Sequence, residues 1–518
     1  MTNASTVLRS LIIYGLCLPL AAILGYLLAT PLDLTTLTVV GAVLFLLLIP
    51  LFLRWHHPWL IATWNMSAVL FFVPGRPQVW MGLAVISFCI GVLQYTINRN
   101  MKFLYVPSVT WPLLFLTAVV VITARLRGGI GLRAFGGSVY GGKNYVMILA
   151  AVLGYFALTS RSIPSKRAVL YVTLFFLGLS TLAIGELPRV LPSGLNFVFW
   201  IFPVFSGGIA AQQTTAVVGA TGDMERINGL AMLGMGIFFA MLARYGLHGI
   251  LLEPRKPWRL AILGAGFLIG LLGGFRSALL LMAMTFALLF FLEGLHHTKL
   301  LLVLTSVAFL GGTLMLAFAN RLPFYMQRSL AFLPVDIDPL ARLSAESSSA
   351  WRLQMWSELL PQVPDYLALG KGYAINPREM EMLGFSRTGE SGIQGAELAG
   401  DYHNGPLSLI IPFGVFGVIG FVWFLWAGFR VLHHNFQFGH PEYQHLNTFL
   451  FGYFCVKVVF FFVVFGGFAS ELMSFTGLVG LSISLNGGMA KSAIVTPEAK
   501  PVFNRFRLHP SVRRPAQA

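Results

Sequence analysis

Three side chains that could act together in group transfer lie far apart in the sequence. Arg226 opens the run "RINGLAMLG", Arg276 lies in "GGFRSALLL", and His403 stands in "GDYHNGPLSLIIPFG". Guanidinium groups match phosphate oxygens, and an imidazole exchanges its proton near neutral pH. The two arginines could therefore hold a diphosphate while the imidazole takes a proton from an acceptor hydroxyl. Singly, they could instead be an interfacial histidine and arginines paired with acids, as Arg226 could pair with Asp223 or Glu225.

A second group of cations lies in the glycine-rich stretch "ARLRGGIGLRAFGGSVYGGKNY" at 124–145. It contains Arg125, Arg127, Arg133 and Lys143. Glycine allows the backbone to approach a ligand closely, and guanidinium forks bind phosphate oxygens. We predict these four residues to be substrate-binding. Binding of lipid headgroups, or pairing with acids, explains the same pattern equally well.

The composition requires a membrane for the elements that carry these residues. Of 518 residues, 57% are hydrophobic and 10% are charged, against about 25% charged in an average soluble domain. The net charge of +16 falls in short clusters between apolar stretches, which is topology information and argues against a nucleic-acid partner. The three cysteines, Cys17, Cys89 and Cys455, lie in apolar runs and offer neither a disulfide framework nor metal spacing. We predict no metal and no cofactor.

The apolar stretches predict an all-α, polytopic membrane helical bundle of about 12–14 transmembrane helices, because a helix needs about 20 apolar residues to cross the hydrocarbon. Candidate spans are 10–30, 34–53, 58–73, 79–97, 106–124, 144–160, 168–187, 228–248, 259–275, 277–294, 299–319, 404–430, 447–466 and 470–487. Span 58–73 is short and could be re-entrant. The apolar piece at 195–205 is too short to span and is expected to lie in the interface or to dip partway in.

The distribution of lysine and arginine predicts which side the termini occupy. Fourteen crossings place both termini on one side, and that side receives eighteen lysines and arginines against eight in the short loops opposite. This asymmetry predicts cytoplasmic termini. The division is then a bundle at 1–319, a large outer loop with short helices at 320–403, further membrane helices at 404–487, and a basic tail at 488–518 that contacts anionic headgroups.

Four stretches resemble, in order, the motifs of the O-antigen ligase and O-antigen polymerase superfamily. They are "RINGLAMLG", "GGFRSALLLMAMTFALLFFLEG", "AWRLQMWSELLPQVPDYLALGKGY" and "YHNGPLSLIIPFGVFGVIGF". The similarity covers roughly 220–430. It departs from the family pattern where the family's glutamate falls on Pro412, and where the asparagine-rich continuation after Arg226 is missing.

The resemblance implies a GT-C-like membrane glycosyltransferase that needs no metal. His403 would be the catalytic base, with Arg276 and Arg226 as essential arginines, and with Arg352 and Asn404 as substrate-binding residues. The donor would be a glycan on undecaprenyl diphosphate, and the acceptor a hydroxyl of a glycan or of lipid A–core. Transfer would occur on the periplasmic side of the bacterial inner membrane, in lipopolysaccharide or exopolysaccharide biosynthesis.

Other functions remain open from the sequence. Ligase and polymerase use the same donor chemistry, and the sequence does not separate them. A transporter or flippase for a lipid-linked or anionic substrate would place ionisable residues within the membrane. Lys457, in "FCVKVVFFFVVF", is such a residue. Its simplest interpretation is snorkelling to the interface, and a proton-coupled role is the alternative. A purely structural scaffold does not explain the outer arginines.

Overall fold

The chain forms a bundle of membrane-crossing helices. The computed structural model describes residues 2–29, 34–98, 103–129, 141–189, 192–204, 227–375, 400 and 402–490. Within these ranges, nine helices are long and apolar enough to cross a membrane, and four shorter apolar helices have 10–17 residues. The described ranges contain no β-strand beyond one isolated bridge between Val69 and Gln78. The chain is therefore an all-helical, multi-pass membrane protein, as predicted.

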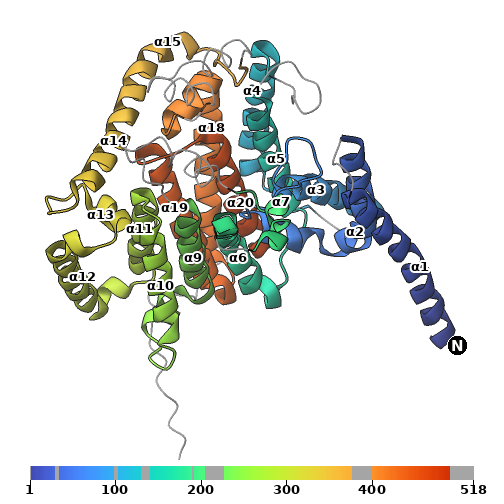
Figure 1. Cartoon of the computed structure of the whole chain (residues 1–518), viewed down its shortest axis with the longest axis horizontal. Helices are drawn as coiled ribbons and strands as arrows, with labels where there is room; N and C mark the ends of the chain where they lie inside the picture. The colour runs from blue at the N-terminus through green and yellow to red at the C-terminus, as the bar shows by residue number, and fades with distance from the viewer. Residues whose placement is uncertain are drawn as a thin grey trace, which may run out of the picture.

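The helices are arranged along the chain as follows (Figure 1). They are α1 (Thr2–Ala29), α2 (Leu34–Thr63), α3 (Val79–Ile97), α4 (Pro107–Arg127), α5 (Gly142–Leu158), α6 (Ala168–Leu177), the 3-10 helix η3 (Gly178–Arg189), α7 (Val198–Ile201), α9 (Asn228–Leu251), α10 (Trp258–Leu272), α11 (Arg276–Leu292), α12 (Leu300–Ala317), α13 (Phe324–Leu330), α14 (Pro339–Leu359), α15 (Val363–Tyr366), α18 (Gly405–Phe438), α19 (Gln444–Val463) and α20 (Phe468–Asn486).

The two ends of the bundle differ in which helix ends and connecting segments lie there. At one end, here named the loop face, α4 ends and α18 begins near α15, and α14 slants from α15 down one side of the bundle to α13 (Figure 1). At the other end, the tail face, the amide of Ile163 donates to the carbonyl of Ser484 near the end of α20. His57 Nε2 also lies 2.8 Å from the carbonyl oxygen of Leu158 there. The described C-terminal residues therefore lie at the tail face.

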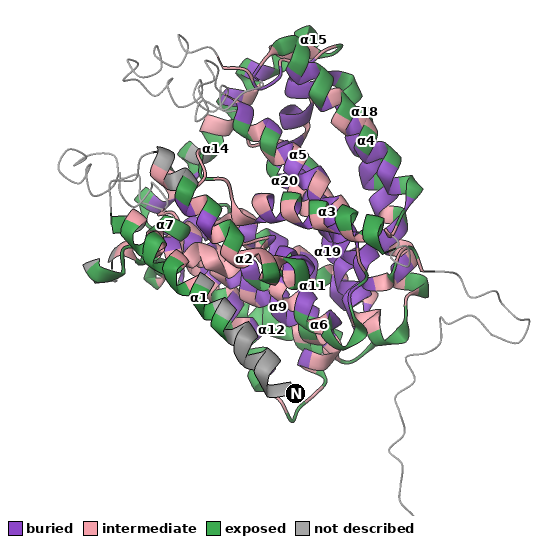
Figure 2. Cartoon of the chain, turned by 90° about the vertical axis from the view of Figure 1, so that its right-hand side faces the viewer, coloured by how far each residue is buried: buried purple, intermediate pink, exposed green. Residues whose placement is uncertain are grey.

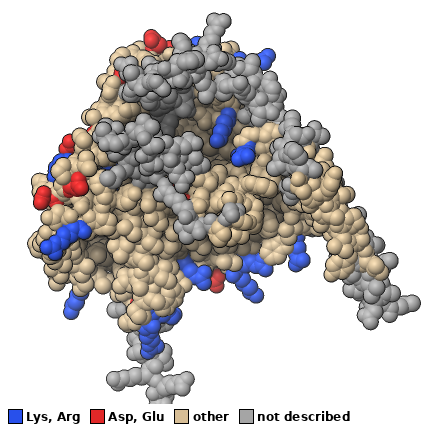
Figure 3. Space-filling view, in the orientation of Figure 1, with Lys and Arg blue, Asp and Glu red and all other residues tan. Residues whose placement is uncertain are grey.

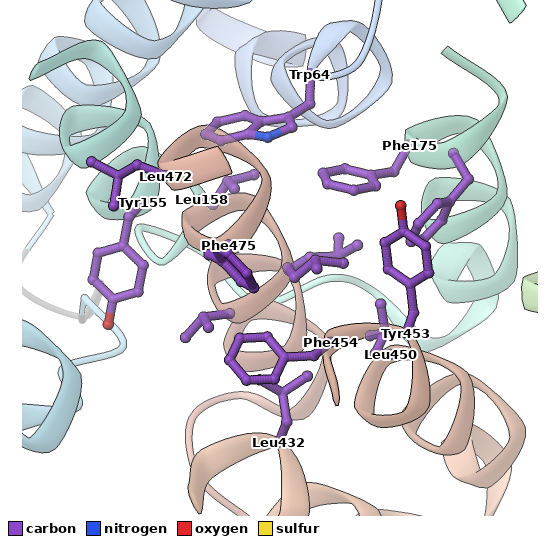
Figure 4. Packing of buried hydrophobic residues seen from close by; sticks show 14 of the residues in the cluster. Trp64, Tyr155, Leu158, Phe175, Leu432, Leu450, Tyr453, Phe454, Leu472 and Phe475 are labelled. Carbon is purple, nitrogen blue, oxygen red and sulfur yellow. The ribbon is translucent and has the colours of Figure 1, made fainter. Parts of the chain in front are cut away.

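The interior is filled by large aromatic side chains packed against small residues. The rings of Trp64 and Trp80 lie 5.3 Å apart, and Phe175, Tyr453 and Phe475 lie in the same cluster (Figure 4). Small residues let the backbones of membrane helices approach closely. Gly154 and Gly477 illustrate this, because a Cβ on either would collide with the ring of Trp64.

Exposed residues lie along the outside of the helices (Figure 2). Many of them are large hydrophobic residues, as expected for contact with lipid. In α12 no residue of the span is buried, and the Phe309 side chain is 78% exposed. Lysines and arginines gather along the tail face, and much of the surface above them carries no charged side chain (Figure 3). This pattern is typical of a hydrocarbon-facing belt that ends at a charged interface.

The predicted separate spans 34–53 and 58–73 are wrong. A single helix, α2, runs through both Pro50 and Pro58 to Thr63. The residues from 64 to 78 that follow are turns and irregular backbone, and Gly75 and Arg76 there have positive φ. Prolines can lie within membrane helices because neighbouring groups satisfy the freed backbone. In the predicted interfacial piece at 195–205, the described residues 195–204 contain the end of the 3-10 helix η4 (Ser193–Leu195) and the single turn of α7.

Candidate active site

Arg276 connects the bundle to the loop helices. It is the first residue of α11, after a turn that requires glycine, because Gly274 has a φ of +75° and a Cβ on Gly273 would lie 2.6 Å from Ala231. The half-buried guanidinium donates through Nη2 to the carbonyl oxygen of Ala345 at 3.3 Å and to Ser349 Oγ at 3.4 Å. Both acceptors lie on α14. The arginine is therefore held at the loop face, against α14.

His403 lies at the start of α18 in a strained conformation. Its φ is +47°, and Arg76 is the other non-glycine residue with positive φ in the described part of the chain. Such a backbone costs about 1–3 kcal/mol and tends to occur at functional sites. The imidazole packs between two rings, with its centroid 5.4 Å from that of Trp351 and 5.3 Å from that of Phe465. The ring is thus fixed in place by aromatic contacts from α14 and from the α19–α20 turn.

Helix α14 brings Arg276 and His403 into one region. Trp356 Nε1 donates to the carbonyl oxygen of Tyr402, the residue before His403, at 3.0 Å. Ser349 and Trp356 are seven residues apart, so they lie on the same stripe of α14, about 10 Å along its axis. Arg276 therefore contacts one end of this stripe and the backbone before His403 contacts the other.

Arg352 occupies the position between these two contacts. It follows Ser349 by three residues and precedes Trp356 by four, which places it on the same stripe of α14. Its side chain is half-buried. The structure therefore places Arg352 and the contacts of Arg276 and of the backbone before His403 along one side of α14. Their role in a joint site stays a prediction. Arg226 lies outside the described residues.

Asn404 has a structural role that the sequence prediction did not include. It is the N-cap of α18, and its Oδ1 accepts a hydrogen bond from the Leu407 amide at 3.0 Å. This bond satisfies one of the free amides of the first turn. Asn404 therefore fixes the start of α18 next to His403, and its side-chain oxygen Oδ1 is occupied by this capping hydrogen bond.

The four cations predicted to bind substrate, Arg125, Arg127, Arg133 and Lys143, differ in what they contact. Arg127, the last residue of α4, donates through Nε to the carbonyl oxygen of Gly370 at 2.9 Å and through Nη2 to that of Leu369 at 3.2 Å. Arg125 and Lys143 are exposed at the same face. Arg133 lies outside the described residues. Arg125, Arg127 and Lys143 are all exposed, and Arg127 in addition binds a turn of its own chain.

That turn, residues 366–373 and here named the docking turn, enters a break in α18. At Gly414 the helix is interrupted, with a φ of 64°. The amides of Lys371 and Gly372 donate to the carbonyls of Ile411 and Pro412 at 2.7 and 3.0 Å, and the amide of Val415 donates to Leu367 at 2.8 Å. Broken backbone within a membrane bundle is tolerated where protein satisfies its polar groups. The docking turn supplies those groups here.

The last residue of the docking turn, Tyr373, is buried. Burial raises the pKa of Tyr373 well above its usual range, and the nearby Tyr402 and Tyr145 add to the effect. Tyr373 therefore stays neutral at physiological pH. Its amide donates to the hydroxyl of Tyr145 at 2.8 Å, which ties the docking turn to α5. The docking turn is thus held against α5 by the ring contact and the hydrogen bond between Tyr373 and Tyr145.

The interpretation of Lys457 as a snorkelling residue is wrong. Its side chain is 9% exposed, and its Nζ lies 2.7 Å from Oε1 and 2.6 Å from Oε2 of Glu471. The lysine head therefore stays inside the bundle in an ion pair. Glu471 lies in the predicted span 470–487, directly after the predicted span 447–466 that contains Lys457. Consecutive spans run antiparallel, so the sequence could have indicated this ion pair.

No protein-family model matches this chain, and no curated protein matches it. The resemblance to the O-antigen ligase and polymerase superfamily therefore stays a prediction. Within the described residues, no group of three or more histidine, cysteine, aspartate or glutamate side chains could hold a metal ion.

Proposed function

We propose that this protein is an O-antigen ligase-like membrane glycosyltransferase. It would move a glycan from undecaprenyl diphosphate to an acceptor hydroxyl, in lipopolysaccharide or exopolysaccharide biosynthesis. The observation that carries the proposal is the row along α14 in which Arg276 contacts Ser349, Arg352 follows, and the His403 segment contacts Trp356. Cations next to a histidine at a membrane surface suit the cleavage of a sugar–diphosphate bond.

In the proposed reaction, His403 takes the proton of the acceptor hydroxyl, and the oxygen attacks the anomeric carbon. The bond from that carbon to the diphosphate oxygen breaks, and the electron pair leaves with the diphosphate. Arg276, with Arg226 as the second arginine, stabilises the growing negative charge, a role worth about 3–4 kcal/mol for one well-placed donor. Arg352 binds the diphosphate of the donor. Attack opposite to the leaving group inverts the anomeric carbon. The base contributes roughly 10²–10⁴-fold.

The proposed orientation places the loop face in the periplasm and the tail face in the cytoplasm of a bacterial inner membrane. Its support is the cluster of cations at the tail face. Arg161 donates to Gln94 there, at 2.6 Å, while Lys256 lies just before α10 and Arg259 lies in its first turn. Cytoplasmic loops carry such an excess of lysine and arginine. A GT-C-like architecture with one large periplasmic loop is part of the same proposal.

The test is a transfer assay with purified protein in lipid, a lipid-diphosphate-linked glycan donor and separate acceptors. His403→Ala and Arg276→Ala should remain inserted and folded and lose transfer by at least 100-fold, whereas Arg255→Ala, on the tail-face connection, should retain it. Activity of either site variant within a few-fold of the unaltered protein would contradict the proposal. Transfer to lipid A–core indicates a ligase, and transfer to a lipid-linked repeat unit indicates a polymerase.

A transporter or flippase is the second candidate. The buried pair of Lys457 and Glu471, and the interruptions of α18 at Gly414 and of α9 at Gly246, favour it. Ionisable groups inside the membrane and broken helices are common in transporters. Movement of a fluorescent lipid-linked glycan across proteoliposomes, without covalent transfer, would support this alternative over the enzyme.

A further inference from the structure

An ion pair lies inside the bundle where the proposed mechanism has no use for it. Lys457 on α19 and Glu471 on α20 are 7% and 9% exposed, and Nζ lies within 2.7 Å of both carboxylate oxygens. Burying two charges is costly, and removing one partner leaves the other uncompensated. Ionisable residues within membrane segments therefore usually have a function.

The two residues belong to the two arms of one helical hairpin. α19 ends at Val463 and α20 begins at Phe468. Lys457 is six residues before the end of α19, and Glu471 is three residues after the start of α20. At 1.5 Å per residue, the pair lies about 5–10 Å from the turn that joins the helices. It ties the arms together just below that turn.

The same turn contacts the segment that carries the histidine. The ring of Phe465 lies 5.3 Å from that of His403, and the amide of Phe468 donates to Ser408 Oγ at 2.9 Å. Gly405 packs directly on the carbonyl of Phe461, where a Cβ would collide. The first turn of α18 is therefore held by both arms of the hairpin and by the turn between them.

Apolar contacts alone allow two helices to slide past one another at small cost. A buried ion pair with short contacts strongly disfavours a shifted register, because a shift leaves charges unpaired in the interior. Glu471 is also in the first turn of α20, where the helix dipole favours a carboxylate. The pair therefore fixes the height of α19 against α20, and with it the position of Phe465.

We propose that Lys457 and Glu471 are positioning residues for the transfer reaction. By fixing the register of the α19–α20 hairpin, they hold Phe465 against the His403 ring and keep the start of α18 in place. This inference rests on the function proposed above. The pair itself touches neither donor nor acceptor, and its effect passes through Phe465 and Ser408.

The experiment combines hydrogen exchange with kinetics on the full-length protein in lipid nanodiscs. Lys457→Met and the near-isosteric Glu471→Gln should raise amide exchange several-fold in peptides covering 403–410 and 464–470, with no change in α3. Transfer should fall at least tenfold through kcat, with KM for the donor changed less than twofold. Lys457→Glu combined with Glu471→Lys should recover part of both, limited by the unfavourable lysine at a helix N-terminus. The control is Lys256→Met, which removes an exposed tail-face pair with Glu253 and should change neither.

Unchanged exchange at 403–410 in both single variants would overturn the inference, as would a rise spread evenly over all helices. If Lys457→Met does not fold, Glu471→Gln decides, since it keeps the shape of the side chain. If the unaltered protein transfers no glycan, the proposed function fails, and the exchange measurement still decides whether the pair positions the His403 segment.

Discussion

Arg127 Nε lies 2.9 Å from the carbonyl oxygen of Gly370, and this contact joins the end of α4 to the docking turn. The second donor, Nη2, binds Leu369. The planar fork of arginine holds both bonds in a fixed geometry, whereas the lysine ammonium is a compact point charge on a flexible stem. Arg127→Ala and Arg127→Lys should therefore both destabilise the fold, by about 1–3 kcal/mol for the loss of hydrogen bonds from a charged donor. Thermal unfolding in detergent measures this, and Arg125→Ala is the control. Equal stability of Arg127→Lys and the unaltered protein would contradict the fork arrangement.

Gly370 should not tolerate a side chain. A Cβ there would collide with the backbone of Pro412 and Phe413, which cannot move without breaking α18. Gly370→Ala should cost about 2 kcal/mol or more, in the range of overpacked interiors. Gly264→Ala in α10 is the matched control, because nothing lies within 4 Å of its position and alanine favours a helix by about 1 kcal/mol. Comparison of the two unfolding temperatures tests the docking of the turn.

Arg352 should contribute to donor binding. It lies between the contacts of Arg276 and of Tyr402 on α14. Arg352→Ala should raise KM for the donor about tenfold or more, because one charge-assisted contact with phosphate is lost. Arg342, on the same helix, donates to the Val335 carbonyl at 2.6 Å, and its replacement by alanine should leave that KM unchanged. Steady-state kinetics at several donor concentrations separates the two.

Asn404 should be replaceable by another capping residue. Its Oδ1 accepts from the Leu407 amide, and serine can make the same bond. Asn404→Ser should keep transfer within a few-fold, and Asn404→Ala should lose about 0.5–2 kcal/mol of stability. A large loss of transfer in a stable Asn404→Ser protein would instead show that the amide binds substrate.

His403 should be a position where stability and activity oppose one another. Its φ of +47° is a conformation that glycine adopts without strain. His403→Gly should recover about 1 kcal/mol of backbone strain, offset in part by the lost ring packing, and should abolish transfer. His403→Ala keeps the strain and also loses the ring, so it should be less stable than His403→Gly. Chemical or thermal unfolding of the two variants gives the comparison.

The sequence was sufficient for the helical, multi-pass class, because its long apolar stretches form helices. The hydrogen-bond partners of the predicted site residues could not be identified from the sequence. The carbonyls bound by Arg127 lie more than 240 positions away, and no local pattern marks them. The sequence predicted one continuous span at 404–430, although Pro412 and Gly414 each disfavour continuous helix, and the turn that fills the break in α18 could not be located from the sequence. The run through Pro50 and Pro58 was misjudged because proline usually ends a helix, yet α2 continues.

The exchange of backbone hydrogen bonds between the docking turn and α18 also bears on how the chain can be divided. The amides of Lys371, Gly372 and Val415 each find their partner across the boundary between loop and membrane helix. An isolated fragment of residues 320–403 would lack these partners, and a bundle without the fragment would carry unpaired carbonyls inside its helical array. The docking turn is thus an integral part of the helical bundle, and neither the 320–403 fragment nor the remaining bundle is expected to fold alone.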